Sequence, residues 1–588
     1  MQENIMNEFQ VNGTSVSAIF TLKLHRGEGV CLIAMNWKTG KPPVDFVGFS
    51  IEYKEPGGDK FFSLKNRIAF PNKSGEVNPN TLSTRLSPIQ KFRWVHFPRN
   101  ADLAGLFTYK VTPVFMNSLD ELSYGEPQYA ELELRQETYP GTLNIAFTRG
   151  FISSQAFIDR YSTVGQSPKQ MTETLLPVKA DDGLNFVPTH PRAAEALAWM
   201  GFEARSAILE VLDQAIDDNT AEVRAVVYDL NEPGIVERFE KLGKRLRIII
   251  DDSGTHGKLT SAETAAFARL QRTAEQAKRQ HLGKLQHNKT IVVGGVVQAC
   301  VCGSTNDSWR GFFVQNNNAI ILRGPKAVEI FMAAYNSYEN SETAAIFSGA
   351  ESAFWNNLQL PGIAAQISFS PRSEVNALLG TIADDIANNT TTSLFFSLAF
   401  LYQTPGLILN AFKKIKEDAT IFSYGISDHA VNGLEDDDTD GPVAVELQKP
   451  NGQMVIVHPK ELTKNVPLPF REEPTGGRGN RMHHKFIVID FNKPTARVYT
   501  GSFNFSSAAD TSNGENLLLI QDQKVAVSYM VEAIRIFDHY HFRVSQANAR
   551  QAQKTLQLMK PPRKKGEHAW WEEDYVDLRK IQDRELFA

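Results

Sequence analysis

The same pattern of polar residues occurs twice in this chain, and it constrains the fold more than any other feature. Each copy has a histidine and a lysine two residues apart, an apolar run, and then a Gly-Ser-x-Asn sequence. The shared residues are His287, Lys289, Ser304 and Asn306 in the first copy and His483, Lys485, Ser502 and Asn504 in the second. The apolar runs TIVV and FIVI are typical of β-strands, in which residues i and i+2 lie on one face. We therefore expect each copy to present its imidazole and ammonium groups on the same side of a sheet.

The repeat extends beyond these residues. The segment AVVYDLNEPGIVERFEKLGKRLRIII aligns with SLAFLYQTPGLILNAFKKIKEDATIF, so that Pro233-Gly234 matches Pro405-Gly406. Helical and strand-like runs alternate here, which predicts α/β units around a largely buried sheet. In the first copy these runs are Arg205–Ala215, Val223–Tyr228, Gly234–Leu242 and Leu246–Ile250, and the helical runs after the two Gly-Ser-x-Asn sequences are Lys326–Glu339 and Lys524–Phe542. The second copy is longer, and the extra length is assigned to a surface insertion at Val431–Arg481.

The first 140 residues have a different texture. Short apolar runs separated by turn sequences such as HRGEG and KTGKPP predict an antiparallel β-sandwich of the immunoglobulin or fibronectin type. The expected strands lie within Val16–Leu24, Val30–Trp37, Val47–Tyr53, Phe92–Phe97, Leu106–Met116 and Ala130–Leu134. The predicted domains are a β-sandwich accessory domain (1–140), a first α/β half (141–345) and a second half with a C-terminal tail (346–588).

The amino-acid composition limits the classes of protein to which this chain can belong. The chain has 588 residues, ordinary globular composition and a net charge of −5, so no chain-wide basic field for gripping nucleic acid is expected. Three cysteines are too few for a disulfide framework. The N-terminus shows no secretory signal, which predicts a cytoplasmic protein or one exported without a cleaved N-terminal signal. The apolar stretch Leu394–Phe412 contains polar residues and proline and is interpreted as buried core.

The doubled set of side chains suits a phosphodiester anion. Lysine and asparagine can hold the non-bridging oxygens, while a neutral histidine attacks phosphorus and a protonated one supplies a proton to the leaving group. Such chemistry requires no metal, and no cluster of ligands with zinc spacing was recognised in the sequence, so no cofactor is expected. Serine nucleophiles are disfavoured because neither serine lies in a Gly-x-Ser-x-Gly sequence.

HxKxxxxD followed by GSxN, present twice in one chain, resembles the phospholipase D superfamily over residues Arg205 to about Phe542. The resemblance implies two α/β halves packed face to face around one shared active site, and a phosphohistidine intermediate. It implies that His287 is the nucleophile and His483 the general acid. It assigns phosphate binding to Lys289, Lys485, Asn306 and Asn504, with Ser304 and Ser502 as phosphate donors or turn residues. It makes Glu515, in the sequence NGEN, the residue that orients a neighbouring histidine.

The first copy departs from the family pattern at two positions. Gly294 stands where the second copy has Asp490, and Asn317 aligns with Glu515. The aspartate lies seven residues after the histidine, so it faces away from the catalytic side of the strand and is expected to give structural support. Loss of a carboxylate partner at position 317 is expected to leave His287 less basic and less firmly oriented.

Other candidate residues have simpler interpretations. His484 should face away from His483 and is interpreted as structural. The acidic run at Asp436, Asp438, Asp440 and Gly441 resembles the start of a calcium loop but has Leu447 at the twelfth position, and it is interpreted as a solvated loop. The aromatic residues Trp309, Phe312 and Phe313 could line the site or pack in the core. The C-terminal tail, with Trp570 and Trp571, is expected to dock on the body of the protein.

These patterns predict a phospholipase D-type phosphodiesterase that hydrolyses glycerophospholipids at a membrane surface to phosphatidic acid and also exchanges head groups. The alternative is a metal-independent nuclease or nucleotide phosphodiesterase, for which the basic stretches Arg238–Arg247 and Ala277–Lys284 could contact a phosphate backbone. A binding scaffold without activity remains a third reading, based on Gly294 and Asn317. Because both copies lie in one chain, a monomer suffices for the site.

Overall fold

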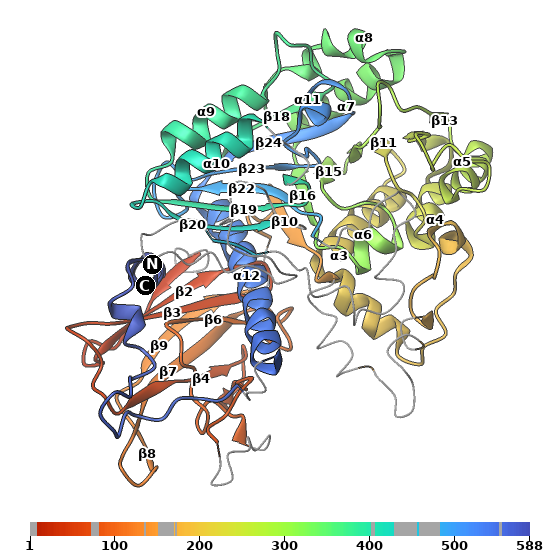
Figure 1. Ribbon diagram of the computed structural model, residues 1–588. Helices are drawn as coiled ribbons and strands as arrows, with labels where there is room; N and C mark the ends of the chain where they lie inside the picture. Colours follow the sequence, from red (N-terminus) through yellow and green to blue (C-terminus); the bar gives the residue numbers. More distant parts are fainter. Residues whose placement is uncertain are drawn as a thin grey trace.

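A computed structural model shows how the chain is arranged (Figure 1). The residues that it describes are 9–71, 81–134, 137–150, 161, 170, 173–401, 406–427, 455–457, 482–551 and 556–588. The architecture is mixed α/β with four sheets. The expected calcium-like run (Asp436–Gly441) lies outside the described residues, as do Pro405 and all of the expected insertion except 455–457.

The N-terminal part consists of two antiparallel sheets that share a core. The first has the order β1 (Gln10–Asn12), β2 (Phe20–Arg26), β3 (Cys31–Trp37) and β6 (Arg93–His96). The second has the order β5 (Phe62–Ser63), β4 (Phe46–Lys54), β7 (Leu106–Met116) and β8 (Leu122–Tyr124), with β9 (Gln128–Glu133) also paired to β7. Residues from both, among them Phe20 and Phe49, pack together because alternate side chains face inward. The expected first strand begins late, at Phe20, since Val16 is 93% exposed.

A seven-stranded sheet holds the first copy of the motif. Its order is β10 (Leu143–Phe147), β16 (Asn318–Arg323), β15 (Ala299–Gly303), β14 (Lys289–Gly294), β11 (Glu222–Val227), β12 (Leu246–Ile250) and β13 (Gln276–Arg279). The last three are parallel and the others antiparallel. The helices of this part are α3 (Ala193–Asp217), α4 (Pro233–Leu242), α5 (Ala262–Thr273), α6 (Trp309–Phe313), α7 (Pro325–Asn340) and α8 (Ala344–Ser348). The short 3-10 turns are η3 (Ala180–Asn185), η4 (Gly243–Arg245) and η5 (Glu351–Ala353).

An eight-stranded sheet holds the second copy. Its order is β17 (Asn356–Asn357), β18 (Ala364–Ser370), β24 (Glu515–Gln521), β23 (Arg497–Gly501), β22 (Lys485–Ile489), β19 (Ser393–Leu398), β20 (Phe422–Ser427) and β21 (Val455–Val457). The helices are α9 (Leu379–Asn389), α10 (Leu407–Glu417), α11 (Ser507–Thr511) and α12 (Gln523–Gln551). From β18 onward, order and strand directions match those of the first sheet. The two copies that align in sequence therefore also have the same sheet topology.

The parts are joined by a continuous hydrophobic core. Figure 1 shows the two larger sheets side by side with helices on their outer sides, and α12 running from them along the N-terminal sheets. Strands such as β12 (LRIII) and β19 (SLFFSL) are buried along most of their length, as expected for parallel neighbours covered on both faces. Residues of β3, β14, β22 and α12 belong to the same core cluster.

The C-terminal tail docks on the N-terminal sheets, as its sequence predicts. After α12 the chain passes through η9 (Glu573–Tyr575) to α13 (Leu578–Phe587). Trp571 is buried in the core of the N-terminal sheets, and the Trp570 indole donates to the Phe46 carbonyl at 3.1 Å. In the stretch Leu394–Phe412, residues 394–398 lie in β19 and residues 407–412 in α10, and most of these side chains are buried. Within the described ranges, no helix has both the length and the hydrophobicity needed to cross a lipid bilayer.

Candidate active site

Each His–Lys pair stands at the start of a strand in the middle of its sheet. Lys289 begins β14 and Lys485 begins β22, and each histidine lies two residues earlier. The Lys289 Nζ donates to the carbonyl of His287 at 2.5 Å, and the Lys485 Nζ donates to that of His483 at 2.9 Å. The alternation of an extended backbone thus delivers both functional groups of a pair to one side.

The fold brings the two histidines together. The ring centroids of His287 and His483 are 6.3 Å apart with an interplanar angle of 70°. Both side chains are buried, with 4% and 5% of their surface exposed. The two copies therefore contribute their imidazoles to a single site.

Each histidine is oriented by a residue of the other copy. The Nδ1 of His287 lies 2.7 Å from Oε2 of Glu515, and the Nδ1 of His483 lies 2.8 Å from Oδ1 of Asn317. The expectation that Asn317 deprives His287 of its carboxylate partner is therefore wrong, because the partners cross over. His287 keeps a carboxylate, and His483 has the amide.

Backbone pairing between the two copies explains this crossing. The Gly514 N–H donates to the Leu285 carbonyl at 2.8 Å, and the His483 N–H donates to the Asn316 carbonyl at 3.2 Å. The segment before His287 therefore runs beside the residues that lead into β24. In the same way, the segment at His483 runs beside the residues that lead into β16. Residues 317 and 515 are delivered to the opposite histidine for this reason.

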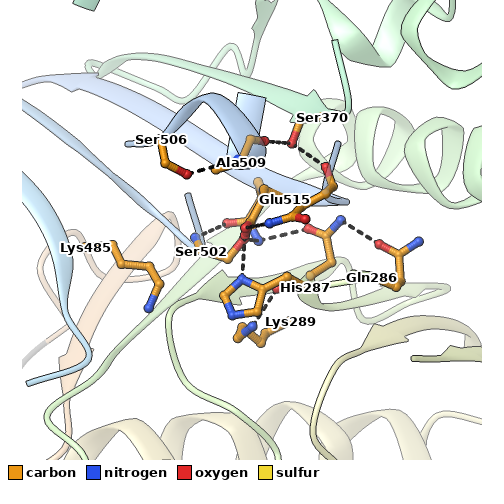
Figure 2. A network of polar contacts seen from close by, with 12 residues as sticks. Gln286, His287, Lys289, Ser370, Lys485, Ser502, Ser506, Ala509 and Glu515 are labelled. Carbon is orange, nitrogen blue, oxygen red and sulfur yellow. Dashed lines mark hydrogen bonds and ion pairs between the residues drawn. The ribbon is translucent and has the colours of Figure 1, made fainter. Parts of the chain in front are cut away.

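Glu515 is held as a hydrogen-bond acceptor (Figure 2). Its Oε2 accepts a bond of 2.7 Å from the Ser502 hydroxyl, and its Oε1 accepts a bond of 3.4 Å from the Asn513 amide. The ionised form of Glu515 only accepts hydrogen bonds, so beside this form we assign the proton of neutral His287 to Nδ1 and the lone pair to Nε2. This is the tautomer in which Nε2 can attack an electrophile.

Asn317 also has one defined orientation. Its Nδ2 donates to the Gly311 carbonyl at 2.8 Å, which leaves Oδ1 facing His483. His483 therefore donates from Nδ1 as well. An amide is uncharged, so it stabilises an imidazolium less than a carboxylate does.

Burial and neighbouring charges shift the pKa values of the titratable groups in the site. Burial lowers the pKa of both imidazoles well below the ordinary value, and the neighbouring lysines lower it further. Burial also lowers the pKa of Lys289 to about 7, although Glu515 and nearby aspartates oppose this effect. Burial and Lys289 lower the pKa of Lys485, and burial raises the pKa of Glu515 to about 8. An anion that enters this site favours the protonated forms of the two lysines and the two histidines, because a nearby opposite charge stabilises the charged form.

The serines support the site instead of facing it. The Ser304 hydroxyl donates to Asn318 at 2.8 Å, that of Ser502 donates to Glu515, and neither side chain is exposed. The prediction that they bind phosphate is therefore not supported by their placement. The preceding glycines allow this close packing: at Gly501 (φ 134°) a Cβ would lie 2.3 Å from the Asn516 carbonyl oxygen.

The asparagines are placed differently. Asn306 and Asn504 each have a buried Oδ1 with no hydrogen-bond partner among the described atoms. Because O and N of an amide can exchange places by a flip, each side chain can offer an unpaired donor at this position. This property agrees with the expectation that the two asparagines contact phosphate oxygens.

The position of Asp490 shows what the motif aspartate does here. Its buried carboxylate accepts bonds from the backbone N–H groups and hydroxyls at the start of β19, including Thr391 and Thr392 at 2.7–3.1 Å. It ties the end of β22 to its neighbouring strand, away from the histidines. At Gly294 an added Cβ would lie 3.1 Å from Met332 and 3.4 Å from Val328, so α7 covers the equivalent place with apolar side chains.

Replacing Asp490 with alanine is expected to lower the free energy of unfolding by about 3 kcal/mol, because backbone N–H groups at the start of β19 lose their acceptor. Urea denaturation followed by circular dichroism measures this change. Asp418→Ala, which removes an exposed carboxylate bonded to Thr420, is the matched control and should have a much smaller effect. Equal midpoints for the two variants would contradict this role of Asp490.

Two aromatic residues that the sequence reading missed complete the site. Tyr228 contacts His287, with ring centroids 4.6 Å apart, and lies 4.7 Å from the Lys289 Nζ. Phe400 lies 6.3 Å from the His483 ring and 5.7 Å from the Lys485 Nζ. The two aromatic residues occupy the same position of the internal repeat. The alignment of the two copies could therefore have identified both as candidate site residues.

Other sequence candidates belong to the core. Phe312 and Phe313 are fully buried, and the Trp309 indole donates to the Gly183 carbonyl at 2.9 Å, so the packing interpretation of these aromatic residues is confirmed. The Nε2 of His484 lies 2.9 Å from Glu532 of α12, on the side away from His483, which confirms a structural role.

Comparison with known proteins agrees with this geometry. A family model described as "Cardiolipin synthase, PLD-like domain" matches residues 446–537, which include His483, Lys485 and Glu515. Residues 446–537, which carry the second copy of the motif, are therefore similar to a phospholipase D-like domain. Similar to this chain are a phospholipase D of Rickettsia conorii (52% identical over 48 residues) and the mitochondrial cardiolipin hydrolase of Xenopus laevis (39% over 59 residues).

These relatives of the phospholipase D superfamily align over short segments. The matches cover 8% of this chain and 22% of the Rickettsia protein, and 10% of this chain and 26% of the Xenopus protein. Among solved structures, phosphatidylserine synthase of Haemophilus influenzae is 13% identical, covers 60% of this chain and 91% of its own, and has a TM-score of 0.39. The family member Nuc of Salmonella typhimurium is 26% identical over 23% of this chain and 87% of its own, with a TM-score of 0.19.

Proposed function

We propose that this protein is a phospholipase D-type phosphodiesterase that hydrolyses glycerophospholipids to phosphatidic acid through a phosphohistidine intermediate. The observation that carries the proposal is the meeting of two buried imidazoles, 6.3 Å apart between ring centroids, at the start of equivalent strands. Two phospholipase D-like halves, residues 141–345 and 346–588, share this site. An immunoglobulin-like accessory domain (1–140) precedes them, and a monomer suffices.

The first step forms the covalent intermediate. The Nε2 of His287 attacks phosphorus, a P–N bond forms, and the bond between phosphorus and the head-group oxygen breaks. Protonated His483 gives its Nε2 proton to that oxygen, which leaves as an alcohol. Lys289 and Lys485 bind the non-bridging oxygens together with Asn306 and Asn504.

The second step reverses the proton transfer. Neutral His483 takes a proton from water, the water oxygen attacks phosphorus, and the P–N bond breaks to release phosphatidic acid. An alcohol that enters in place of water yields a new diester, so exchange of head groups accompanies hydrolysis.

The two partners of the histidines support this division of roles. Glu515 is a positioning residue that fixes the tautomer of His287 and stabilises the positive charge of a phosphorylated imidazole. His483, beside the uncharged Asn317, forms an imidazolium that gives up its proton more readily. The nucleophile is therefore assigned to His287 and the general acid to His483.

A lipid is favoured over a nucleic acid by the surface as well as by the relatives. The basic stretches that could contact a phosphate backbone are largely paired within the protein. Arg238 forms an ion pair with Asp213, Arg247 with Glu339, and the Lys278 Nζ donates to the Glu339 carbonyl. The relatives that match are named phospholipase D and cardiolipin hydrolase.

The test is release of head groups from vesicles by the purified protein. Vesicles of phosphatidylcholine, phosphatidylethanolamine and cardiolipin should yield phosphatidic acid or, from cardiolipin, phosphatidic acid and phosphatidylglycerol, and added ethanol should yield phosphatidylethanol. Degradation of single-stranded DNA or RNA without lipid turnover would replace this proposal with the nuclease. Inactivity toward all of these substrates and toward an aryl phosphodiester would refute enzymatic function.

The ionisation of Lys289 predicts how anion binding depends on pH. With its pKa lowered to about 7, the ammonium group loses its proton as the pH rises through that value, so affinity for an anion should fall. Sulfate keeps its charge between about pH 6 and 9, so the loss of affinity reports the protein alone. The inhibition constant of sulfate against an aryl phosphodiester should rise about tenfold per pH unit above the pKa. A constant value across this range would contradict the prediction.

A further inference from the structure

A second cluster of titratable side chains lies beside the active site in the first half. Asp229 follows β11, His256 lies in the loop after β12, and Glu263 is in the first turn of α5. One ligand atom from each lies within 4.8 Å of the other two. His256 and Glu263 are 8% and 3% exposed. The sequence patterns do not predict this cluster, because the three residues come from different elements and have no characteristic spacing.

His256 is oriented toward the carboxylates of this cluster. Its Nδ1 lies 2.8 Å from Oδ2 of Asp251, which is fully buried and also accepts bonds from Ser253 and from the Gln286 N–H. Its Nε2 has no hydrogen-bond partner within the described part of the chain, and the Glu263 Oε1 lies 3.9 Å away. An imidazole held by a carboxylate through one nitrogen, with the other nitrogen aimed at further carboxylates, is the arrangement found at metal-binding histidines.

We propose that Asp229, His256 and Glu263 bind one divalent transition-metal ion, of the class of Zn²⁺ or Mn²⁺. One nitrogen and two oxygen donors suit these ions. Two bonds of about 2.0–2.1 Å at a tetrahedral angle span about 3.4 Å, so the 3.9 Å gap between His256 and Glu263 closes with a small movement of either side chain. The proposal is independent of the proposed phosphodiesterase function.

The charges around the cluster favour a cation. Three carboxylates, those of Asp229, Asp251 and Glu263, lie around the His256 imidazole, and Asp229 and Asp251 also interact with the charge of Lys289. The Arg279 guanidinium donates to the backbone carbonyls of Asp251 and His256 and to the Thr264 hydroxyl. Burying like charges together is costly unless they are paired or coordinate a metal. A divalent ion offsets this cost.

The ion would act on the structure of the site and not on the reacting phosphate. The Tyr228 ring contacts both His256 and His287, with centroids 4.5 Å and 4.6 Å away. Asp251, which holds His256, also binds the backbone of Gln286, next to His287. The second half has Leu401 at the repeat position of Asp229, so this carboxylate has no equivalent in the second copy. A bound ion therefore braces the loop that presents His287.

The experiment measures metal binding directly in the full-length protein. Protein stripped with a chelator and dialysed is titrated with Zn²⁺ and with Mn²⁺ by calorimetry, and metal content after gel filtration is measured by mass spectrometry. One ion per chain and a rise in Tm of several degrees are expected. Glu263→Gln and His256→Gln should weaken binding at least about tenfold.

His281→Gln is the matched control. His281 forms a similar pair with Asp252, at 2.7 Å, but is half exposed and outside the cluster, so this variant should bind the ion as the wild type does. Failure of the wild type to retain a stoichiometric ion would overturn the proposal, and so would unchanged binding by Glu263→Gln. If the variants do not fold, anomalous scattering from zinc in wild-type crystals locates the ion. An ion located away from Asp229, His256 and Glu263 would also overturn the proposal. None of these readouts requires phosphodiesterase activity.

Discussion

Replacing His287 with alanine is expected to lower kcat/KM toward an aryl phosphodiester by about 10⁴-fold or more, because this change removes the proposed nucleophile of the covalent intermediate. His483→Ala should be distinguishable from it. An aryl leaving group needs little protonation, so phosphoryl transfer to His287 continues while hydrolysis of the intermediate, which needs a base, becomes slow. We therefore expect a burst of released phenol and accumulation of phosphorylated His287, detected by mass spectrometry at alkaline pH.

The matched control for both variants is His281→Ala, because this histidine is half exposed and paired only with Asp252 in the described structure. Its activity should equal that of the wild type. Phosphate found on His483 in the His287→Ala protein would reverse the assignment of nucleophile and acid. Wild-type activity in either variant would show that the pair of imidazoles is not the reaction centre.

Changing the partners of the two histidines should have different effects, a loss of rate for one partner and a shift of the pH profile for the other. Glu515→Gln is expected to lower kcat about 10- to 100-fold, because the amide neither supports the basicity of His287 nor balances Lys289 and Lys485. Glu515→Asp should restore part of the loss. Asn317→Asp gives His483 a carboxylate neighbour, which favours its protonated form, so its pKa should rise by about 1 unit or more.

The direction in which the pKa of His483 shifts in the Asn317→Asp protein is the sharper test. The general acid must be protonated, so a higher pKa of His483 moves the alkaline limb of the kcat profile to higher pH. A residue with only a structural role would change the amplitude of the profile and leave its limbs in place. An Asn317→Asp protein with an unshifted alkaline limb would contradict the pairing of Asn317 with His483 during turnover.

Much of the local structure follows from the sequence, because the period of apolar residues is imposed by local geometry. The strands at Leu106–Met116 and Leu246–Ile250 and the helix at Gly234–Leu242 lie where the patterns predict. The strand expected from Val16 begins at Phe20, because the apolar Val16 lies in an exposed bend before it. Local hydrophobicity does not reveal which short apolar runs find a partner strand.

The sequence by itself determined which reactive groups the site contains. These are two His–Lys pairs, each kept on one side of a strand by the two-residue period, and a repeat that places Tyr228 and Phe400 at equivalent positions. The sequence did not determine how these groups are paired. That His287 takes Glu515 and His483 takes Asn317, that Ser304 and Ser502 turn inward, and that Asp229, His256 and Glu263 meet were all decided by the tertiary structure. The histidine contacts join the two copies through backbone pairing between them, whereas the other contacts join elements of one copy that are separated in the sequence. The spacing of residues in the chain reveals neither arrangement.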